Sequence, residues 1–318
     1  MEIGINGTNT LLSGDLSAIR VDIQAAETDG FSAYWLAQSG SIDALTVYAA
    51  HGAGDVAGDG AGGGAGHGGT ELGTAVIPTW TVHPQAVAAQ ALTTQAAIGG
   101  RLVLGLGLSH EPTVRTRWKL EWERPVRQML DFLDILQPLL TDGAADHDGH
   151  FWSYSGEIQQ VGTAPKVMLA ALGEQMLRIA GRRTDGTVLW CVGPKTLRDH
   201  IAPTINAAAA DADRPNPAIV CSLPVWVTDD PGPARDFLDL ILASYAELPS
   251  YAAMLEREGV DGIGELAIVG SEAEVTDRIG ALEDAGATQL SAAPVGGSPE
   301  ETARTRSVLV AAQTERTA

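Results

Sequence analysis

Short apolar runs alternate with amphipathic segments along most of the chain. Eight runs have the length and apolar character of strands, at residues 2–6, 33–37, 72–78, 101–107, 166–171, 186–191, 218–227 and 289–295. Between them, apolar residues recur at helical spacing, for example at 17–28, 42–50, 83–98, 115–140, 174–181, 194–210, 233–258, 271–284 and 299–313. Pro125 interrupts the stretch at 115–140, which is expected to form one helix or two. After Arg101, the run at 101–107 is apolar without interruption, which is typical of a parallel strand buried on both faces.

Eight strands that alternate with helices favour an eight-stranded β/α barrel over a six-stranded doubly wound sheet. A dinucleotide-binding sheet would place a glycine fingerprint between its first strand and first helix, and residues 7–12 lack one. The 318 residues allow one large domain or two smaller ones. The barrel pattern leads us to predict a single α/β domain over residues 1–318.

Two segments interrupt the alternation and are predicted to be insertions at the C-terminal face of the barrel. Residues 52–69 are rich in glycine and are expected to form a flexible loop. This loop twice matches G-x-G-x-x-G, but neither match follows a strand and opens a helix, so no dinucleotide site is predicted there. Residues 141–164 are expected to form an excursion with a hairpin before the strand at 166–171.

The charge balance limits the partners that the protein can bind. Its 40 acidic and 20 basic residues give a formal net charge of -20, whereas a nucleic acid or an anionic membrane requires a basic surface. No run of about 18 apolar residues and no signal peptide is present, so a cytoplasmic protein is expected. Cys191 and Cys221 have no partner cluster, which disfavours a disulfide framework or a zinc site.

Two other polar clusters do not predict chemistry of their own. Residues 146–150 gather possible metal ligands, but a metal site needs three or four converging ligands and Gly149 favours a turn, so no metal is predicted. Residues 108–111 place Ser, His and Glu side by side, but sequence neighbours cannot line up as nucleophile, base and orienter. Because G-x-S-x-G is also absent, a hydrolase is not favoured.

The carboxyl ends of the predicted strands hold the residues of most interest, because function in a β/α barrel gathers there. The third strand ends in an apolar bulge followed by Trp80, and the fourth contains Gly105 and Gly107, where a flat ligand could approach the backbone. The fifth strand runs through Gly173 directly into a helix, whose free N–H groups and positive dipole end suit a phosphate. Together these ends favour a flavin-like cofactor.

Several segments, taken in order and spacing, resemble the bacterial luciferase-like flavin and deazaflavin oxidoreductases, and more closely the branch that uses coenzyme F420. They lie at 25–35, 72–76 with 83–84, 100–107, 180–181 with 185–188, 268–271 and 284–287, and so span most of the chain. The resemblance implies a luciferase-like (β/α)8 TIM barrel and hydride transfer between C5 of the deazaflavin and a small organic substrate. It also implies a homodimer.

The resemblance further implies a set of cofactor contacts. A non-prolyl cis peptide that backs the ring would fall at Ala75–Val76. The remaining contacts would come from the strand-four end for ring and tail, the strand-five end for the phosphate, and the strand-six end beside the ring: Leu108, Ser109, His110 and Thr113; Ala170, Ala171, Leu172 and Gly173; and Trp190 and Cys191.

Two residues are candidates for catalysis. Gln38 stands where sugar-phosphate dehydrogenases of this group have a histidine base, and a glutamine can form hydrogen bonds but cannot take a proton at neutral pH. His110 is therefore the best-placed titratable group, as an acid or base or else as a hydrogen-bonding ligand to the cofactor. Asn6, Trp80 and Trp226 are predicted to shape the substrate pocket, although an aromatic residue on a barrel strand is core at least as often.

Some alternatives stay open. Arg115, Arg117 and Lys119 could neutralise the anionic tail of F420, or they could form a solvated helix face. FMN could replace F420 in a luciferase-like monooxygenase of the same fold, because the two ring systems have similar shapes. A barrel that binds a flavin or deazaflavin without turning it over is a third interpretation.

Overall fold

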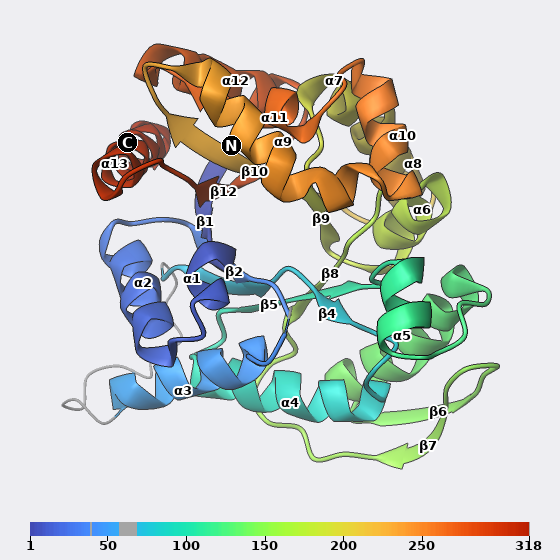
Figure 1. Cartoon of the computed structure of the whole chain (residues 1–318). Coiled ribbons are helices and arrows are strands. Elements are labelled where there is room, and N and C mark those ends of the chain that lie inside the picture. Colours follow the sequence, from blue (N-terminus) through green and yellow to red (C-terminus); the bar gives the residue numbers. More distant parts are fainter. Residues whose placement is uncertain (39, 57–68, 318) are drawn as a thin grey trace. The chain divides into compact units, whose positions relative to one another are not determined.

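A computed structural model describes residues 1–38, 40–56 and 69–317 (Figure 1). The chain divides into two compact units. One, called here the discontinuous unit, combines residues 1–35 with 171–318, and the other, the continuous unit, spans residues 36–170.

The continuous unit is built on a parallel sheet in which β5 pairs with β3, β4 and β8. Its strands are β3 (Glu71–Thr74), β4 (Ile77–Pro78), β5 (Leu102–Gly107) and β8 (Lys166–Leu169). Its helices are α3 (Ala44–Val56), α4 (Pro84–Ala97), the π-helical η1 (Thr113–Arg117) and α5 (Pro125–Thr141). An antiparallel hairpin of β6 (Ala144–Asp148) and β7 (Ser153–Glu157) follows α5, as the pattern at 141–164 predicted.

The discontinuous unit holds a second run of parallel strands in the order β9-β10-β12-β1-β2, with β11 beside β10. Its strands are β1 (Glu2–Asn6), β2 (Ala33–Leu36), β9 (Gly186–Trp190), β10 (Ala218–Val227), β11 (Ile268–Gly270) and β12 (Gln289–Pro294). Its helices are α1 (Thr8–Leu12), α2 (Leu16–Thr28), α6 (Glu174–Arg183), α7 (Pro194–Thr196), η2 (Leu197–Ile201, π-helical), α8 (Ala202–Ala210), α9 (Pro231–Ala246), α10 (Pro249–Glu258), α11 (Ile263–Leu266), α12 (Glu272–Asp284) and α13 (Pro299–Thr317).

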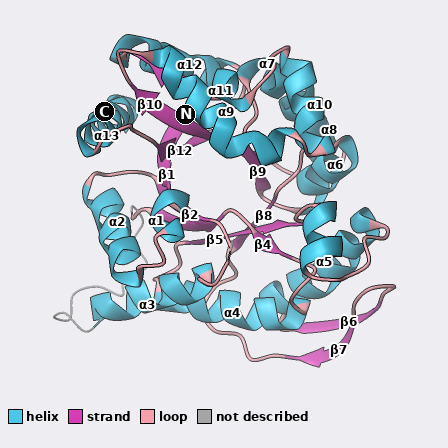
Figure 2. Ribbon diagram, in the orientation of Figure 1, coloured by secondary structure: helices cyan, strands magenta, loops and turns pink. Residues whose placement is uncertain are grey.

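The alternation of strands and helices (Figure 2) follows the predicted order, because the apolar runs are buried where strands were expected. All six residues of β5 and all four of β2 are buried, as in parallel strands covered on both faces. The indole N–H of the buried Trp35, on β2, has a hydrogen-bond partner, since Nε1 donates to Gln289 Oε1 on β12 at 2.8 Å. The start of α12 is stabilised by a capping box between Ser271 and Glu274.

Two boundaries differ from the prediction, and one predicted break is confirmed. The run at 72–78 is two strands, β3 and β4. The stretch at 115–140 is a π-helix and α5, and α5 begins at Pro125, where a division into two helices was one of the predicted outcomes. Helix α3 extends to Val56, so residues 52–56 of the predicted glycine-rich loop are helical, and 57–68 lie outside the described residues. Within the described part of the chain, no helix combines the length and the apolar character that crossing a membrane requires.

Candidate functional site

The break between β3 and β4 forms a bulge at the carboxyl end of β3. The peptide bond between Ala75 and Val76 is cis, at the position that the family resemblance implied. Thr74, at the end of β3, joins the bulge to β5, because its Oγ1 donates to Gly105 O at 2.8 Å and accepts from Gly105 N at 2.9 Å. The bulge is therefore fixed by side-chain hydrogen bonds as well as by the sheet.

The two glycines of β5, Gly105 and Gly107, leave room for this bulge. A Cβ atom added to Gly105 would lie 1.9 Å from the carbonyl oxygen of Thr74, and one added to Gly107 would lie 2.4 Å from Val76 Cγ2. These glycines were predicted to let a flat ligand approach the backbone. The structure gives another reason for glycine at both positions, because atoms of Thr74 and Val76 already occupy the space that a side chain would need.

The connection that follows β5 carries four of the predicted cofactor contacts. Leu108, Ser109, His110 and Thr113 are all half-buried. Ser109 has the left-handed backbone conformation with φ of 60°, which is uncommon for a residue other than glycine and is found most often at functional sites. Burial lowers the pKa of His110 below its ordinary value of 6.5, so the neutral imidazole predominates at pH 7.

The amide of Gln38 has a structural partner that the sequence did not reveal. Gln38 Oε1 accepts a hydrogen bond of 2.8 Å from the N–H of Ala44, the first residue of α3. The side chain thus satisfies one of the free donors at the start of that helix. This contact fixes the orientation of the amide group.

Trp80 belongs to an aromatic cluster between β4 and the hairpin. Its ring centroid lies 5.4 Å from that of Trp122 and 5.8 Å from that of Phe151. Among the described residues its buried Nε1 has no hydrogen-bond partner. His83, by contrast, caps α4, because its Nδ1 accepts from Gln85 N at 3.1 Å, and its ring packs edge-on against Trp152.

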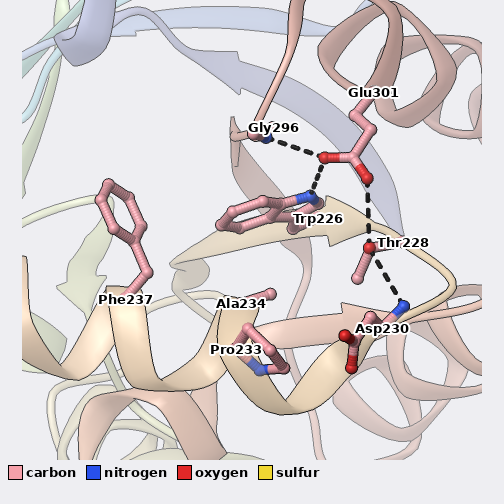
Figure 3. A pocket seen from close by; sticks show the side chains of 9 residues that line it. Trp226, Thr228, Asp230, Pro233, Ala234, Phe237, Gly296 and Glu301 are labelled. Carbon is pink, nitrogen blue, oxygen red and sulfur yellow. Dashed lines mark hydrogen bonds between the residues drawn. The ribbon is translucent and has the colours of Figure 1, made fainter.

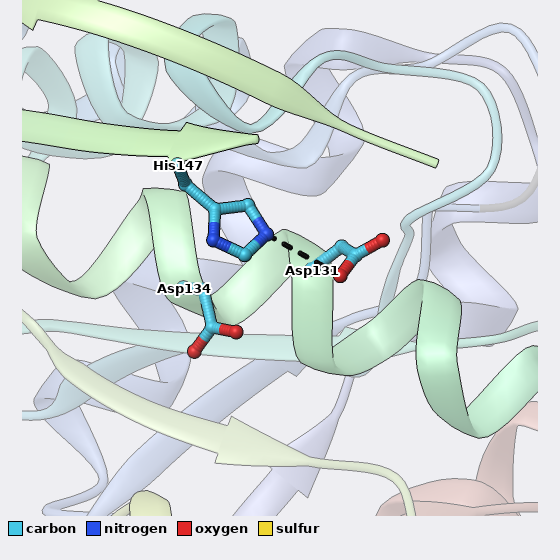
Figure 4. A group of neighbouring side chains, drawn as sticks. All are labelled: Asp131, Asp134 and His147. Carbon is cyan, nitrogen blue, oxygen red and sulfur yellow. Dashed lines mark hydrogen bonds and ion pairs between the residues drawn. The ribbon is translucent and has the colours of Figure 1, made fainter. Parts of the chain in front are cut away.

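A buried carboxylate fastens the hairpin to α5 (Figure 4). Asp131 accepts hydrogen bonds from Phe151 N at 2.9 Å and His147 Nε2 at 3.3 Å, and it pairs with Arg127 at 2.8 Å. Burial raises the pKa of Asp131, but these donors more than offset it, so the pKa lies below its ordinary value. Ligand atoms of Asp131, Asp134 and His147 lie within 4.8 Å of one another. Because Arg127 and two hairpin groups already hold Asp131, this cluster is explained as a structural contact.

The segment before α6 offers an open helix N-terminus within the discontinuous unit. Gly173 is the N-cap of this ten-residue helix, and no side chain in the described part of the chain caps it. A Cβ atom added to Gly173 would meet no atom of the described residues within 4 Å. Leu172 O accepts a hydrogen bond of 2.9 Å from His200 Nε2. Ala170, the last residue of the continuous unit, donates its N–H to Leu106 O.

The end of β9 repeats the backbone geometry seen after β5. Cys191 has a φ of 53°, and a π-helix follows in the same connection. Burial raises the pKa of the Cys191 thiol well above its usual range, and burial with the nearby Glu258 carboxylate raises that of Cys221 to about 12, so both remain thiols at neutral pH. The buried Nε1 of Trp190 has no partner among the described residues.

Asn6 and Trp226, predicted to shape the substrate pocket, have different hydrogen-bond partners. Asn6 Nδ2 donates to Ser222 Oγ at 2.9 Å, and Asn6 Oδ1 accepts from Thr8 N at 3.0 Å. Trp226 Nε1 donates to Glu301 Oε2 at 3.1 Å (Figure 3). Trp226 lines an open pocket of about 420 Å³ together with Thr228, Asp230, Pro233, Ala234, Phe237, Gly296, Gly297 and Glu301.

The predicted basic cluster is only partly available for an anion. Arg115 Nε lies 2.7 Å from Glu111 Oε1, and its Nη1 lies 3.3 Å from Glu121 Oε2. A third contact joins Arg115 Nη2 to the carbonyl oxygen of Trp122 at 3.1 Å. Two carboxylates thus compensate Arg115, which leaves the exposed Arg117 and Lys119 as the better candidates.

The sequence matches known proteins over most of its length. The family model for luciferase-like monooxygenases matches residues 70–289. A 5,10-methylenetetrahydromethanopterin reductase from Archaeoglobus fulgidus is 25% identical over 264 residues, which cover 72% of this chain and 77% of that protein. An F420-dependent glucose-6-phosphate dehydrogenase from Mycobacterium avium is 31% identical over 175 residues, about half of each chain.

The fold is also that of known structures. The coenzyme F420-dependent tetrahydromethanopterin reductase from Methanopyrus kandleri has a TM-score of 0.78 at 18% identity, covering 98% of this chain and 97% of that one. The oxygenating constituent of 3,6-diketocamphane monooxygenase from Pseudomonas putida, solved with FMN, has a TM-score of 0.74 at 16% identity. It also covers 98% of this chain and 97% of that one. These likenesses confirm the predicted (β/α)8 TIM barrel. Since the family model covers more than half of the sequence, the chain belongs to the luciferase-like monooxygenase family.

Proposed function

We propose that the protein is a coenzyme F420-dependent oxidoreductase that transfers a hydride between the cofactor and a small organic substrate. The observation that carries the proposal is the open, uncapped N-terminus of α6 after Gly173, which suits the phosphate of such a cofactor. The sequence relatives named as F420-dependent or as methylenetetrahydromethanopterin reductases support F420 over FMN.

Two observations indicate that the residues present fit a phosphate-bearing deazaflavin cofactor. Within residues 1–38, 40–56 and 69–317, no side chain caps the N–H groups at the start of α6, and no atom would lie within 4 Å of a Cβ added to Gly173. The buried Nε1 of Trp190 has no acceptor among the described residues, and a buried donor of this kind is costly unless something accepts from it. We assign phosphate contacts to the strand-five end, Ala170, Ala171, Leu172 and Gly173. Contacts with the ring and tail are assigned to Leu108, Ser109 and Thr113, and contacts with the ring to Ala75, Val76, Trp190 and Cys191.

When bound, F420 supplies hydride transfer at C5 of the deazaflavin, and the protein supplies orientation and exclusion of water. His110 is the residue that moves a proton. Its neutral imidazole can accept a proton from a substrate hydroxyl through a ring nitrogen, because burial keeps its pKa low. Gln38, whose Oε1 is held by Ala44, supplies a hydrogen bond and no proton.

The substrate walls and the anionic tail of the cofactor have separate candidates. Trp80 offers an aromatic face and a buried N–H without an acceptor among the described residues, which suits a substrate oxygen. Asn6 and Trp226 remain candidates in the other unit. Arg117 and Lys119 are assigned to the tail in preference to the compensated Arg115. The homodimer implied by the resemblance also stays a prediction, which sedimentation of the purified protein tests.

A titration of the purified protein with F420 and, separately, with FMN tests the cofactor. Tryptophan fluorescence reports binding. Micromolar affinity for F420 with at least ten-fold weaker affinity for FMN is the expected result. Binding of neither cofactor would refute the proposal.

The second candidate function is an FMN-dependent monooxygenase. The description of the matching family and the likeness to an FMN-containing monooxygenase favour it. Preference for FMN in the titration, with oxygen uptake when reduced FMN is supplied, would establish this alternative. A barrel that binds without turnover is excluded as soon as reduced cofactor is oxidised by any candidate substrate.

A further inference from the structure

His200 connects η2 to the segment that precedes α6. Its Nε2 lies 2.9 Å from the carbonyl oxygen of Leu172, so that nitrogen carries the hydrogen and donates it. The imidazole is half-buried. A side chain 28 residues further along the chain therefore holds the peptide group that joins Leu172 to Gly173.

The frame around this contact is tightly packed. Helix α6 lies close against α8, because a Cβ atom added to Gly181 would stand 2.3 Å from the carbonyl oxygen of Ile205. The backbone of His200 is tied into the following helix, since Thr204 Oγ1 donates to His200 O at 2.6 Å. The π-helical turn at Leu197–Ile201 interrupts the regular helical geometry around this residue. His200 thus links η2 to the segment that leads into α6, next to the close contact between α6 and α8.

The geometry of the peptide group gives this bridge a directional effect. In a trans peptide, the carbonyl oxygen and the amide hydrogen point in opposite directions from one rigid plane. A donor that fixes Leu172 O therefore also fixes the direction of the N–H of Gly173. Glycine has little resistance of its own to rotation of that plane, because it allows more backbone conformations than any other residue.

We propose that His200 is a positioning residue that sets the Gly173 N–H for an anionic group at the start of α6. This inference rests on the proposed function, because the anion is the phosphate of the flavin or deazaflavin cofactor. His200 acts through the peptide and does not touch the ligand. It adds a residue to the phosphate site that no local sequence pattern marks.

Matched ligands and matched variants test the inference. FMN and riboflavin differ only in the phosphate. For the deazaflavin, the ring with its ribityl chain is compared with the 5′-phosphate of the same compound, so that the remainder of the F420 tail is absent from both. His200→Leu removes the donor at similar volume, whereas His200→Gln keeps an N–H that can reach Leu172 O. Dissociation constants are measured by fluorescence for whichever ring the wild-type protein binds.

We expect the wild-type protein to prefer the phosphorylated ligand. His200→Leu should weaken binding of that ligand about ten-fold, the size of one lost hydrogen bond to a charged group, and leave binding of the phosphate-free ligand unchanged. His200→Gln should restore most of the preference. A structural role alone would weaken both ligands equally.

Three outcomes overturn the inference. An unchanged phosphate preference in His200→Leu would refute it while the proposed function stands, and so would equal weakening of both ligands. Failure of the wild-type protein to bind any of the four ligands would refute the proposed function and this inference with it. If His200→Leu does not fold, His200→Asn, whose shorter side chain cannot span to Leu172 O, replaces it with the same expected result.

Discussion

Replacement of Gly107 by alanine tests whether the bulge between β3 and β4 dictates the glycines of β5. The new Cβ atom would lie 2.4 Å from Val76 Cγ2, whereas ordinary contact begins at 3.4 Å, so the Val76 side chain must move by about 1 Å. Overpacking of this kind costs about 2 kcal/mol. We expect Gly107→Ala to be less stable by that amount.

The neighbouring atoms provide an internal rescue. Val76→Ala removes the clashing methyl groups and leaves Ala170 Cβ at 3.4 Å and Val76 Cβ at 3.5 Å as the nearest atoms to a Cβ at position 107. Val76→Ala alone loses two methyl groups, about 1.5 kcal/mol at most. The double variant should therefore lose about 1.5 kcal/mol in place of the 3.5 kcal/mol of a simple sum, a coupling of about 2 kcal/mol.

Urea unfolding followed by tryptophan fluorescence measures these differences for the wild type, both single variants and the double variant. Gly105→Ala serves as a matched control. Its Cβ would lie 1.9 Å from the backbone oxygen of Thr74, so Val76→Ala should not rescue it. Additive losses in the Gly107 cycle, or a Gly107→Ala protein as stable as the wild type, would refute the reasoning.

Three further predictions concern Asp131, Gly193 and His110. Asp131→Asn should cost about 3 kcal/mol at pH 7, because it leaves Arg127 and the hairpin donors without a charge. Since the pKa of Asp131 is lowered on folding, this stabilisation is present above the unfolded pKa of about 3.9 and is lost as the pH falls through the folded pKa. Urea titrations at pH 7 and pH 3 should show the difference from the wild type shrinking. Gly193→Ala should lower the melting temperature, because its Cβ would lie 2.3 Å from the carboxyl carbon of Glu258 and would displace a carboxylate that accepts hydrogen bonds from Lys195 N and Thr196 N. An unchanged melting curve would contradict this. His110→Ala should reduce turnover far more than cofactor affinity, and the wild-type rate should begin to fall only below pH 6.5, where the neutral imidazole is lost. Loss of affinity alone would reassign His110 as a binding residue.

The strands were predictable because burial on both faces produces a signal within each segment. Residues 102–107 are apolar at every position except the two glycines, and all six are buried. The hairpin was predictable from its composition, but the carboxylate that holds it, Asp131, lies on a helix and reads as a polar residue within an amphipathic pattern.

Site residues were harder to interpret because their contacts depend on how the backbone and side chains are arranged in space, which a residue pattern does not show. The reason for Gly107 is the Val76 side chain, and the partner of Gln38 is a backbone N–H at the start of α3. Arg115 was a candidate to neutralise the anionic tail of the cofactor, but in the structure it pairs with Glu111 and Glu121. His200 gave no signal at all, because its contact depends on how closely two helices pack.

The pairing of β1 with β12 has a consequence for how the protein is made. Glu2 lies opposite Gln289 in this register, so one edge of β1 has no partner until 287 further residues have been synthesised. At about 5–20 residues per second, that interval is about 15–60 s on the ribosome. The pairings of β5 with β3, β4 and β8, by contrast, join residues that lie within 72–169. Vectorial synthesis therefore favours folding of the middle of the sequence before the N-terminal strand finds its last neighbour.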